Sequence, residues 1–260
     1  MMLFPPQEMM DAVHGGPISS SDHAAIGAHF RDLVLKRCAL APSDAILDIG
    51  CGCGRFAQQL TPQHRGAYDG LDIVLPMVEW CRNNISASHP NFSFHHADLA
   101  NTLYKGGRGD AAAYTFPFSD RQFDVVVAFS VFTHLVPASA ARYAAEIARV
   151  LRPGGRALMT FYLTGHGRPT LELPHPFGRC RVAQADNPEA VIGYELDDAT
   201  TLIERAGLHM KQISFGNWAQ HSDGWTYQDA ILAVRPMTLR YRAARIAGRL
   251  LQRSAVSRST

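Results

Sequence analysis

ILDIGCGCGR, residues 46–55, is the stretch that decides the fold. Its first half is the apolar run of a buried strand, and its second half alternates glycine with cysteine before Arg55. Glycine removes side chains where the chain turns sharply, so that a ligand can lie against the backbone. The spacing D-x-G-x-G-x-G differs from the G-x-G-x-x-G fingerprint of dinucleotide-binding proteins. We therefore expect a strand, a ligand-binding turn and a helix, in that order.

The composition indicates a folded domain without an export or membrane signal. The 260 residues are 47% hydrophobic, which suits one α/β domain with additions. The net charge of +2 gives no argument for nucleic acid, although Arg outnumbers Lys by 22 to 3. The five cysteines form no C-x-x-C pair, and the longest apolar run, 125–132, is shorter than the roughly 20 residues that span a bilayer. We expect a cytoplasmic protein with reduced thiols and, lacking an H-E-x-x-H motif, no metal site.

Short β-rich segments alternate with helical segments from residue 42 onward. Strands are predicted at 45–49, 68–72, 92–96, 123–129 and 156–161, helices at 54–60, 76–88 and 138–150, and then a helix at 197–206 and strands at 209–215 and 226–234. This alternation predicts an α/β fold with a doubly wound, mostly parallel sheet. Ligands of such sheets bind beyond the carboxyl ends of the strands.

The chain divides into a central domain, residues 41–236, and two flanking parts. Residues 1–40 are expected to form an N-terminal arm and a covering helix, which Ser21-Asp22 caps and which ends near Arg37. Residues 163–195, rich in Gly, Pro, His and Arg, are too long for an ordinary connection and predict a substrate-facing insertion or lid. Residues 237–260 form a basic amphipathic tail.

Acidic residues stand at the ends of the first three predicted strands. Asp72 can accept hydrogen bonds from both hydroxyls of an adenosine ribose, and Asp98 from an adenine amine while Leu99 packs on the ring. Asp48, just before the glycine turn, can receive an ammonium group. The sequence therefore predicts an adenosine slot beside a site for an amino-acid-like tail.

Together these blocks resemble the class I S-adenosylmethionine-dependent methyltransferases. The resemblance covers about residues 40–165 and is carried, in the family's order, by 47–54, 70–73, 97–99, 116–126 and 151–156. It implies a Rossmann-like, seven-stranded sheet with the last strand antiparallel and S-adenosylmethionine as cofactor. By position it implies cofactor contacts from Asp48, Gly50, Cys51, Gly52, Gly54, Asp72, Ile73, Asp98, Leu99, Phe129 and Ser130. Leu99 and Phe129 are equally explained as core residues.

Methyl transfer from a sulfonium is an in-line displacement, which needs alignment and the exclusion of water. An alcohol acceptor also needs a general base, and His134, just beyond the fourth strand, is the candidate. The alternative is a histidine that only orders its loop. His166 and His175 in the insertion and Trp218 near the last strands are candidates for binding substrate, and each is also explained as an ordinary loop or core residue.

A short likeness at 215–218 and 228–233 to bacterial methyltransferases of cell-surface sugars favours O-methylation. The expected acceptor is a sugar, free or in a glycoconjugate, or another small hydroxylated metabolite. The alternatives are an NAD-dependent oxidoreductase, a non-catalytic S-adenosylmethionine-binding module, and an RNA or protein methyltransferase. Arg55 stands where the oxidoreductase fingerprint needs a late glycine, and residues from 129 onward lack the Asn/Asp-Pro-Pro-Phe/Tyr motif of amino-group methylation. The oligomeric state is left open.

The tail generates a prediction of its own. Residues 239–253 place four arginines on the helix face opposite the apolar residues, which suits either an anionic membrane or packing on the domain with the arginines in water. If the tail docks on membranes, the protein should co-sediment with anionic liposomes at low salt and detach at about 1 M salt, where the Debye length is about 3 Å. Neutral liposomes are the control. Failure to bind anionic liposomes at low salt would rule the membrane out.

Overall fold

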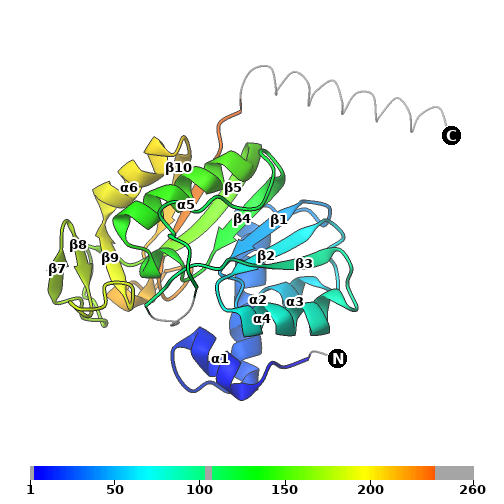
Figure 1. Ribbon diagram of the computed structural model, residues 1–260. Helices are drawn as coiled ribbons and strands as arrows, with labels where there is room; N and C mark the ends of the chain where they lie inside the picture. The colour runs from blue at the N-terminus through cyan, green and yellow to red at the C-terminus, as the bar shows by residue number, and fades with distance from the viewer. Residues whose placement is uncertain (1–2, 103–106, 238–260) are drawn as a thin grey trace.

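A computed structural model of the chain describes residues 3–102 and 107–237. Its main element is a seven-stranded sheet in the order β10-β11-β5-β4-β1-β2-β3 (Figure 1). The strands are β1 Ile46–Ile49, β2 Tyr68–Asp72, β3 Phe92–His96, β4 Phe123–Ala128, β5 Leu151–Phe161, β10 His209–Ser214 and β11 Asp229–Val234. β11 runs antiparallel to both of its neighbours, and β1 to β5 are parallel. The predicted doubly wound sheet with an antiparallel last strand is confirmed.

Helices cover both faces of this sheet (Figure 1). They are α1 Gln7–His14, α2 Ser20–Arg37, α3 Ala57–Leu60, α4 Leu75–Cys81, α5 Pro137–Val150 and α6 Leu196–Arg205, with a π-helical turn η1 at Arg82–Ser86 and 3-10 turns η2 at Phe132–His134 and η3 at Asn217–Ala219. The period of two along β4 explains the two layers, because Val126 and Ala128 pack with α5 and α6, whereas Val125 and Val127 pack with α2, α3 and α4.

The N-terminal arm is more regular than its sequence predicts. α1 lies within residues that show no periodicity and ends at Gly15, whose φ of +82° suits a left-handed helix cap. The next helix is capped by Ser19 and not by Ser21-Asp22, because the Ser19 hydroxyl accepts a hydrogen bond from the Asp22 N–H. Eight residues are too few for a convincing amphipathic pattern, so packing on α2 decides that α1 forms.

The insertion at 163–195 also contains regular structure. It holds β6 Leu163–Thr164, β7 His175–Phe177, β8 Cys180–Val182 and β9 Ile192–Glu195, which form a second sheet in the order β6-β9-β8-β7 beside α6 (Figure 1). Strands of two to four residues show no readable alternation, which is why the sequence predicts only an irregular segment here. β5 likewise begins at Leu151 and not at Arg156, because Leu151 already pairs with Phe123.

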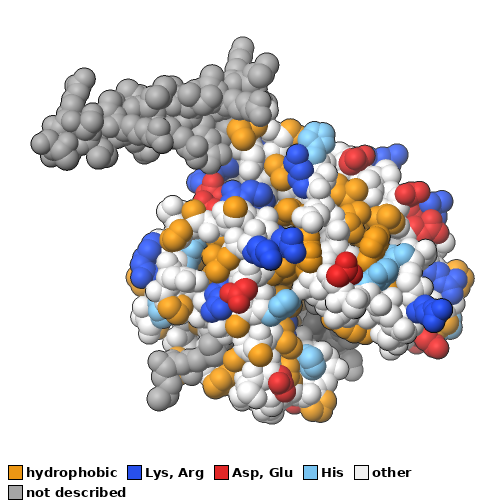
Figure 2. Space-filling view, turned by 180° about the vertical axis from the view of Figure 1, so that it is seen from behind, with side chains coloured by type: hydrophobic (Ala, Val, Ile, Leu, Met, Phe, Trp, Pro, Cys, Tyr) orange, Lys and Arg blue, Asp and Glu red, His pale blue; other side chains and the backbone are white. Residues whose placement is uncertain are grey.

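The structure bears on the predictions about membrane and nucleic-acid partners. Within the described ranges, no helix is long and apolar enough to cross a membrane. The predicted basic tail, residues 237–260, lies outside the described residues apart from Met237. On the face drawn in Figure 2, basic side chains are scattered among acidic and apolar ones and do not gather into a stripe.

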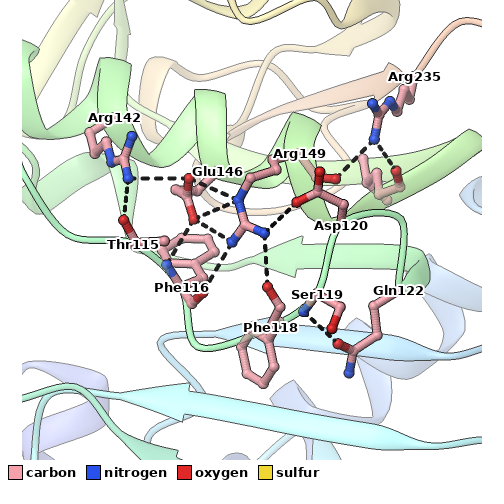
Figure 3. Close-up of polar contacts among 11 residues, drawn as sticks. Thr115, Phe116, Phe118, Ser119, Asp120, Gln122, Arg142, Glu146, Arg149 and Arg235 are labelled. Atoms are coloured by element: carbon pink, nitrogen blue, oxygen red, sulfur yellow. Dashed lines mark hydrogen bonds and ion pairs between the residues drawn. The ribbon is translucent and has the colours of Figure 1, made fainter.

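A polar network fixes the segment that leads into β4 (Figure 3). Glu146 of α5 is only 3% exposed and accepts hydrogen bonds from the Phe116 N–H at 2.8 Å and from Arg149 Nη2 at 2.6 Å. Arg149 also donates to the carbonyl oxygens of Phe116 and Phe118 and to Asp120. Burial alone would raise the pKa of Glu146, but the hydrogen bonds from Arg149 and Phe116 lower it.

Replacing Arg149 by Met leaves the Glu146 carboxylate buried without its main cation. We expect the free energy of unfolding to fall by about 2 kcal/mol, less than for a fully buried pair because Arg149 is partly exposed. Urea denaturation at pH 7 measures it. The matched variant is Arg142→Met, whose guanidinium lies 3.3 Å from Glu146 and should contribute less than about 1 kcal/mol. Equal losses for the two variants would contradict the assignment.

Candidate functional site

The predicted cofactor residues meet at the carboxyl edge of the main sheet. Because β1, β2, β3 and β4 are parallel, the segments that follow Ile49, Asp72, His96 and Ala128 emerge on the same side. The structure therefore brings together the glycine turn, the two strand-end acids and the segment that carries Phe129, Ser130 and His134.

The glycine turn is bent as its sequence predicts. Gly50 and Gly52 have φ angles of +70° and +52°, a region that other residues enter at a cost. A Cβ on Gly50 would lie 2.6 Å from Val131 Cγ2, and a Cβ on Gly52 would lie 2.9 Å from Val13 Cγ2 of α1. Both positions thus require glycine, and α1 packs directly against the turn.

Asp72 ties this turn to β2. It is 8% exposed, and its two carboxylate oxygens accept the Gly52 N–H at 2.7 Å and the Val74 N–H at 2.8 Å. Burial raises the pKa of Asp72, and these backbone hydrogen bonds oppose the rise. Each carboxylate oxygen keeps a second lone pair, so Asp72 can also accept a ribose hydroxyl.

Asp48 lies beneath the turn and is buried. The Tyr68 hydroxyl donates a hydrogen bond to its Oδ2. Burial and the nearby Asp72 together raise the pKa of Asp48 to about 7, against the lowering effects of the Tyr68 hydrogen bond and of Arg55. Since the carboxyl group titrates near neutrality, a bound ammonium group would hold it ionised.

The adenine-side residues differ in exposure. The Asp98 side chain is exposed, whereas Leu99 is buried and Ile73 is half-buried against the same core cluster. The backbone of Asp98 accepts the Gly109 N–H at 2.9 Å, which holds this loop at the sheet edge. Cys51 packs its buried thiol below the turn, close to Gly70, and burial raises its pKa well above the usual range. Cys51 therefore offers its backbone and not a reactive thiol.

Phe129 and Ser130 begin the segment after β4. Phe129 stacks on Phe30 of α2, with ring centroids 4.1 Å apart and an interplanar angle of 3°. Its 8% exposure favours the core interpretation. Ser130 has a φ of +57°; its N–H donates to Thr160 Oγ1 at 2.7 Å, and its hydroxyl lies 3.2 Å from Gln228 Oε1. These contacts set the direction in which the chain continues toward His134.

His134 is held in one orientation. Its Nδ1 lies 3.0 Å from the Glu189 carbonyl oxygen. A carbonyl can only accept, so Nδ1 carries the proton and Nε2 of the neutral ring keeps its lone pair. Burial lowers the pKa of His134, and the Glu189 hydrogen bond opposes this. The ring is therefore neutral at pH 7 and able to accept a proton at Nε2.

The three substrate-side candidates do not converge. His175 is exposed on β7, in the second sheet. Trp218 is 1% exposed, and its ring meets Tyr162 edge-on with centroids 4.9 Å apart, which favours packing over stacking on a ligand. His166 lies with its Nδ1 3.0 Å from His221 Nε2 and its Nε2 3.5 Å from Asp229 Oδ1.

Asp229 is the residue that sequence analysis missed here. It is fully buried and accepts hydrogen bonds from the Trp218 indole N–H, the Leu163 N–H and the Gly216 N–H, at 2.6 to 2.7 Å. The sequence does hold a signal for it, because Asp229 is an acidic residue at the start of the otherwise apolar strand β11. It connects the end of β5 to the loop before β11.

A pocket of about 740 Å³ lies between the second sheet and the start of α6. Its wall combines apolar side chains, Trp218 among them, with charged ones. The lining residues are Thr164, Gly165, Pro169, Leu171, Glu172, Leu173, Pro174, Arg181, Glu195, Leu196, Asp197 and Trp218. In the part of the chain that the structure describes, no cluster of three or more His, Cys, Asp or Glu side chains could hold a metal ion.

The strand order, the glycine turn after β1 and the acid at the end of β2 define a Rossmann-like methyltransferase fold. A family model described as a methyltransferase domain matches residues 46–155. The chain is 27% identical over 198 residues to the O-methyltransferase cnsE of Penicillium expansum and 24% identical over 210 residues to the methyltransferase GfsG of Streptomyces halstedii. These matches cover 76% and 78% of the chain and 64% and 68% of the two relatives.

Among solved structures, the (4+2)-cyclase SpnF has the same fold. The TM-score is 0.60 at 19% identity, over 89% of this chain and 93% of that one. The chain therefore has the fold of the class I S-adenosylmethionine-dependent methyltransferases and is similar in sequence to methyltransferases over residues 46–155; S-adenosylmethionine is the cofactor of that class. The residues fit that molecule, because the side-chain-free turn leaves backbone for its methionine part and the acids at the strand ends suit its ammonium and ribose groups.

The Asp72→Asn variant tests this fit. A carboxamide has a single acceptor oxygen, so the Gly52 N–H or the Val74 N–H loses its partner and the turn loosens. We expect S-adenosylhomocysteine to bind about tenfold more weakly, as measured by calorimetry. Asp69→Asn on the same strand, where Asp69 pairs with His95, is the matched control and should bind normally. Unchanged binding to Asp72→Asn would contradict its role.

Proposed function

We propose that the protein transfers a methyl group from S-adenosylmethionine to a hydroxyl oxygen of a small acceptor, with His134 as general base. The observation that carries the proposal is the tautomer of His134, which presents an unprotonated Nε2 just after β4. Relatives named as O-methyltransferases, including cnsE, support oxygen as the acceptor atom. The acceptor proposed is a sugar, free or in a glycoconjugate, or another small hydroxylated metabolite.

When bound, S-adenosylmethionine supplies an electrophilic methyl group. The glycine turn and Asp72 would hold it, with Asp48 at its ammonium group and Asp98 and Leu99 at its adenine. His134 Nε2 would take the proton of the acceptor hydroxyl as the oxygen attacks, and the Glu189 carbonyl keeps the ring in the orientation that this requires. Fixed positions of base and donor supply the alignment on which such displacements depend.

The segment that carries Glu189 also supports a closed site. Glu189 accepts hydrogen bonds from the Thr102 N–H at 3.0 Å and from the Thr102 hydroxyl at 2.9 Å, while its carbonyl meets His134. It thus links the loop after β3 to the turn after β4, on both sides of the β1 glycine turn. Such a bridge would restrict water at the site during transfer.

The pocket between the second sheet and α6 supports a polar acceptor. Glu172, Glu195 and Arg181 offer acceptors and donors for hydroxyl groups, and the leucines beside them offer an apolar wall. Contacts link the turn after β4 to Trp218 in the lining of this pocket. Ser130 Oγ lies 3.2 Å from Gln228 Oε1, Gln228 Nε2 lies 3.5 Å from the Tyr162 hydroxyl, and the Tyr162 ring meets the Trp218 ring. We infer that the acceptor enters from this side.

Transfer of a radiolabelled methyl group tests the proposal directly. The protein should label a member of a panel of sugars, glycoconjugates and phenols, and mass spectrometry should place the methyl group on oxygen. A direct assay is needed because one protein of this fold is named as a cyclase. Labelling on nitrogen, labelling of RNA or protein only, or binding of NAD in place of S-adenosylmethionine would overturn it.

His134→Gln removes the base. We expect kcat to fall at least about a hundredfold, with S-adenosylhomocysteine binding unchanged. In the wild type, kcat/KM should rise with pH as His134 loses its proton, and because burial lowers that pKa, the rise should occur at a lower pH than for an ordinary histidine. His89→Gln, which replaces another histidine bonded to a backbone carbonyl, is the control. Normal turnover by His134→Gln would leave only the loop-ordering role.

A further inference from the structure

His23 of α2 is a buried histidine without partners. It is 2% exposed, and neither of its ring nitrogens has a hydrogen bond within the described ranges 3–102 and 107–237. A neutral imidazole carries one donor and one acceptor, and leaving both unpaired inside a protein is costly. Core packing alone does not explain why an imidazole without hydrogen bonds is buried at this position.

Its position points to the glycine turn. Residues four apart share a helix face, so His23 and Gly27 point the same way. Gly27 packs on the residue that ends the turn so closely that a Cβ there would lie 2.4 Å from the Arg55 carbonyl oxygen. α1 closes the same place, with Val13 against Gly52. His23 therefore faces the end of the turn, under a cover made by the N-terminal arm.

The surroundings of His23 are positive. Burial, together with the charges of Arg55 and His14, lowers the pKa of His23 to about 4. The Arg55 guanidinium lies 5.2 Å from the Phe30 ring centroid, and no ion pair to Arg55 is found among the described residues. Asp48, the nearby acid, is already bonded to Tyr68. A half-buried cation and an unpaired imidazole N–H together favour an anion.

We propose that His23 and Arg55 bind the carboxylate of the amino-acid tail of S-adenosylmethionine. The inference rests on the proposed function, which places that tail at the glycine turn. It divides the two charges of the tail: the ammonium goes to Asp48 below the turn, and the carboxylate goes to His23 and Arg55 at its end. Binding would give the buried imidazole the partner that the free protein lacks.

Ligands that lose the tail stepwise test this division. S-Adenosylhomocysteine carries both charges, decarboxylated S-adenosylmethionine keeps the ammonium only, and 5′-methylthioadenosine has neither. We expect His23→Leu and Arg55→Gln each to weaken S-adenosylhomocysteine about tenfold or more, and to change binding of the other two ligands less than about twofold. Calorimetry on the full chain measures all nine combinations with wild type.

Stability separates a ligand-binding role from a structural one. If His23 stabilises the fold, the His23→Leu protein should unfold at a lower temperature than the wild type. If His23 serves to bind a ligand, the thermal midpoint of the ligand-free His23→Leu protein should be unchanged or higher. His64→Leu, at another buried histidine with an unpartnered ring nitrogen, is the matched control and should leave all three affinities unchanged. Arg55→Gln keeps the test open should His23→Leu fail to fold.

Three results would overturn the inference. They are equal losses for all three ligands, no loss for S-adenosylhomocysteine in either variant, or wild-type affinity for 5′-methylthioadenosine as high as for S-adenosylhomocysteine. A wild-type protein that binds none of the three would instead contradict the proposed function, because the adenosine slot itself would then be wrong.

Discussion

The carboxylate of Asp72 is the constraint on which the site depends. Its hydrogen bonds to the Gly52 and Val74 N–H groups join the turn after β1 to the end of β2. The two parallel strands would otherwise end in separate loops, and the turn would lose the bend that Gly50 and Gly52 adopt at positive φ. Because these hydrogen bonds are charge-assisted and buried, they hold the backbone close to the shape a ligand needs before it arrives.

The N-terminal helices complete this site from outside the sheet. α2 stacks Phe30 on Phe129 and packs Gly27 on Arg55, and α1 places Val13 on Gly52. The cover therefore touches the turn after β1 and the turn after β4 at once. These contacts are made by apolar side chains and by the backbone. The imidazole of His23 also lies in this layer, and neither of its ring nitrogens has a hydrogen-bond partner among the described residues.

Strand-end motifs were predictable because they are local. Asp48, the glycine turn, Asp72 and Asp98 follow apolar runs directly, so strand polarity alone places them on one edge. The second sheet, α1 and the Ser19 cap were not predicted, because segments of two to eight residues carry too little periodicity. Asp229 and His23 were missed for another reason: a single polar residue in an apolar segment acquires meaning only from neighbours distant in the chain.

The sequence by itself determined the strands of the main sheet and most of the helices between them, the bend of the glycine turn and the acids around it, since each follows from residues adjacent in the chain. The tertiary structure alone decided which ring nitrogen of His134 carries the proton, because the Glu189 carbonyl that fixes it lies 55 residues away. It also decided that His166 and Trp218 meet at Asp229 while His175 stands apart, and that α1 and α2 close over the turn. Such contacts depend on packing across the whole domain, which no local pattern records.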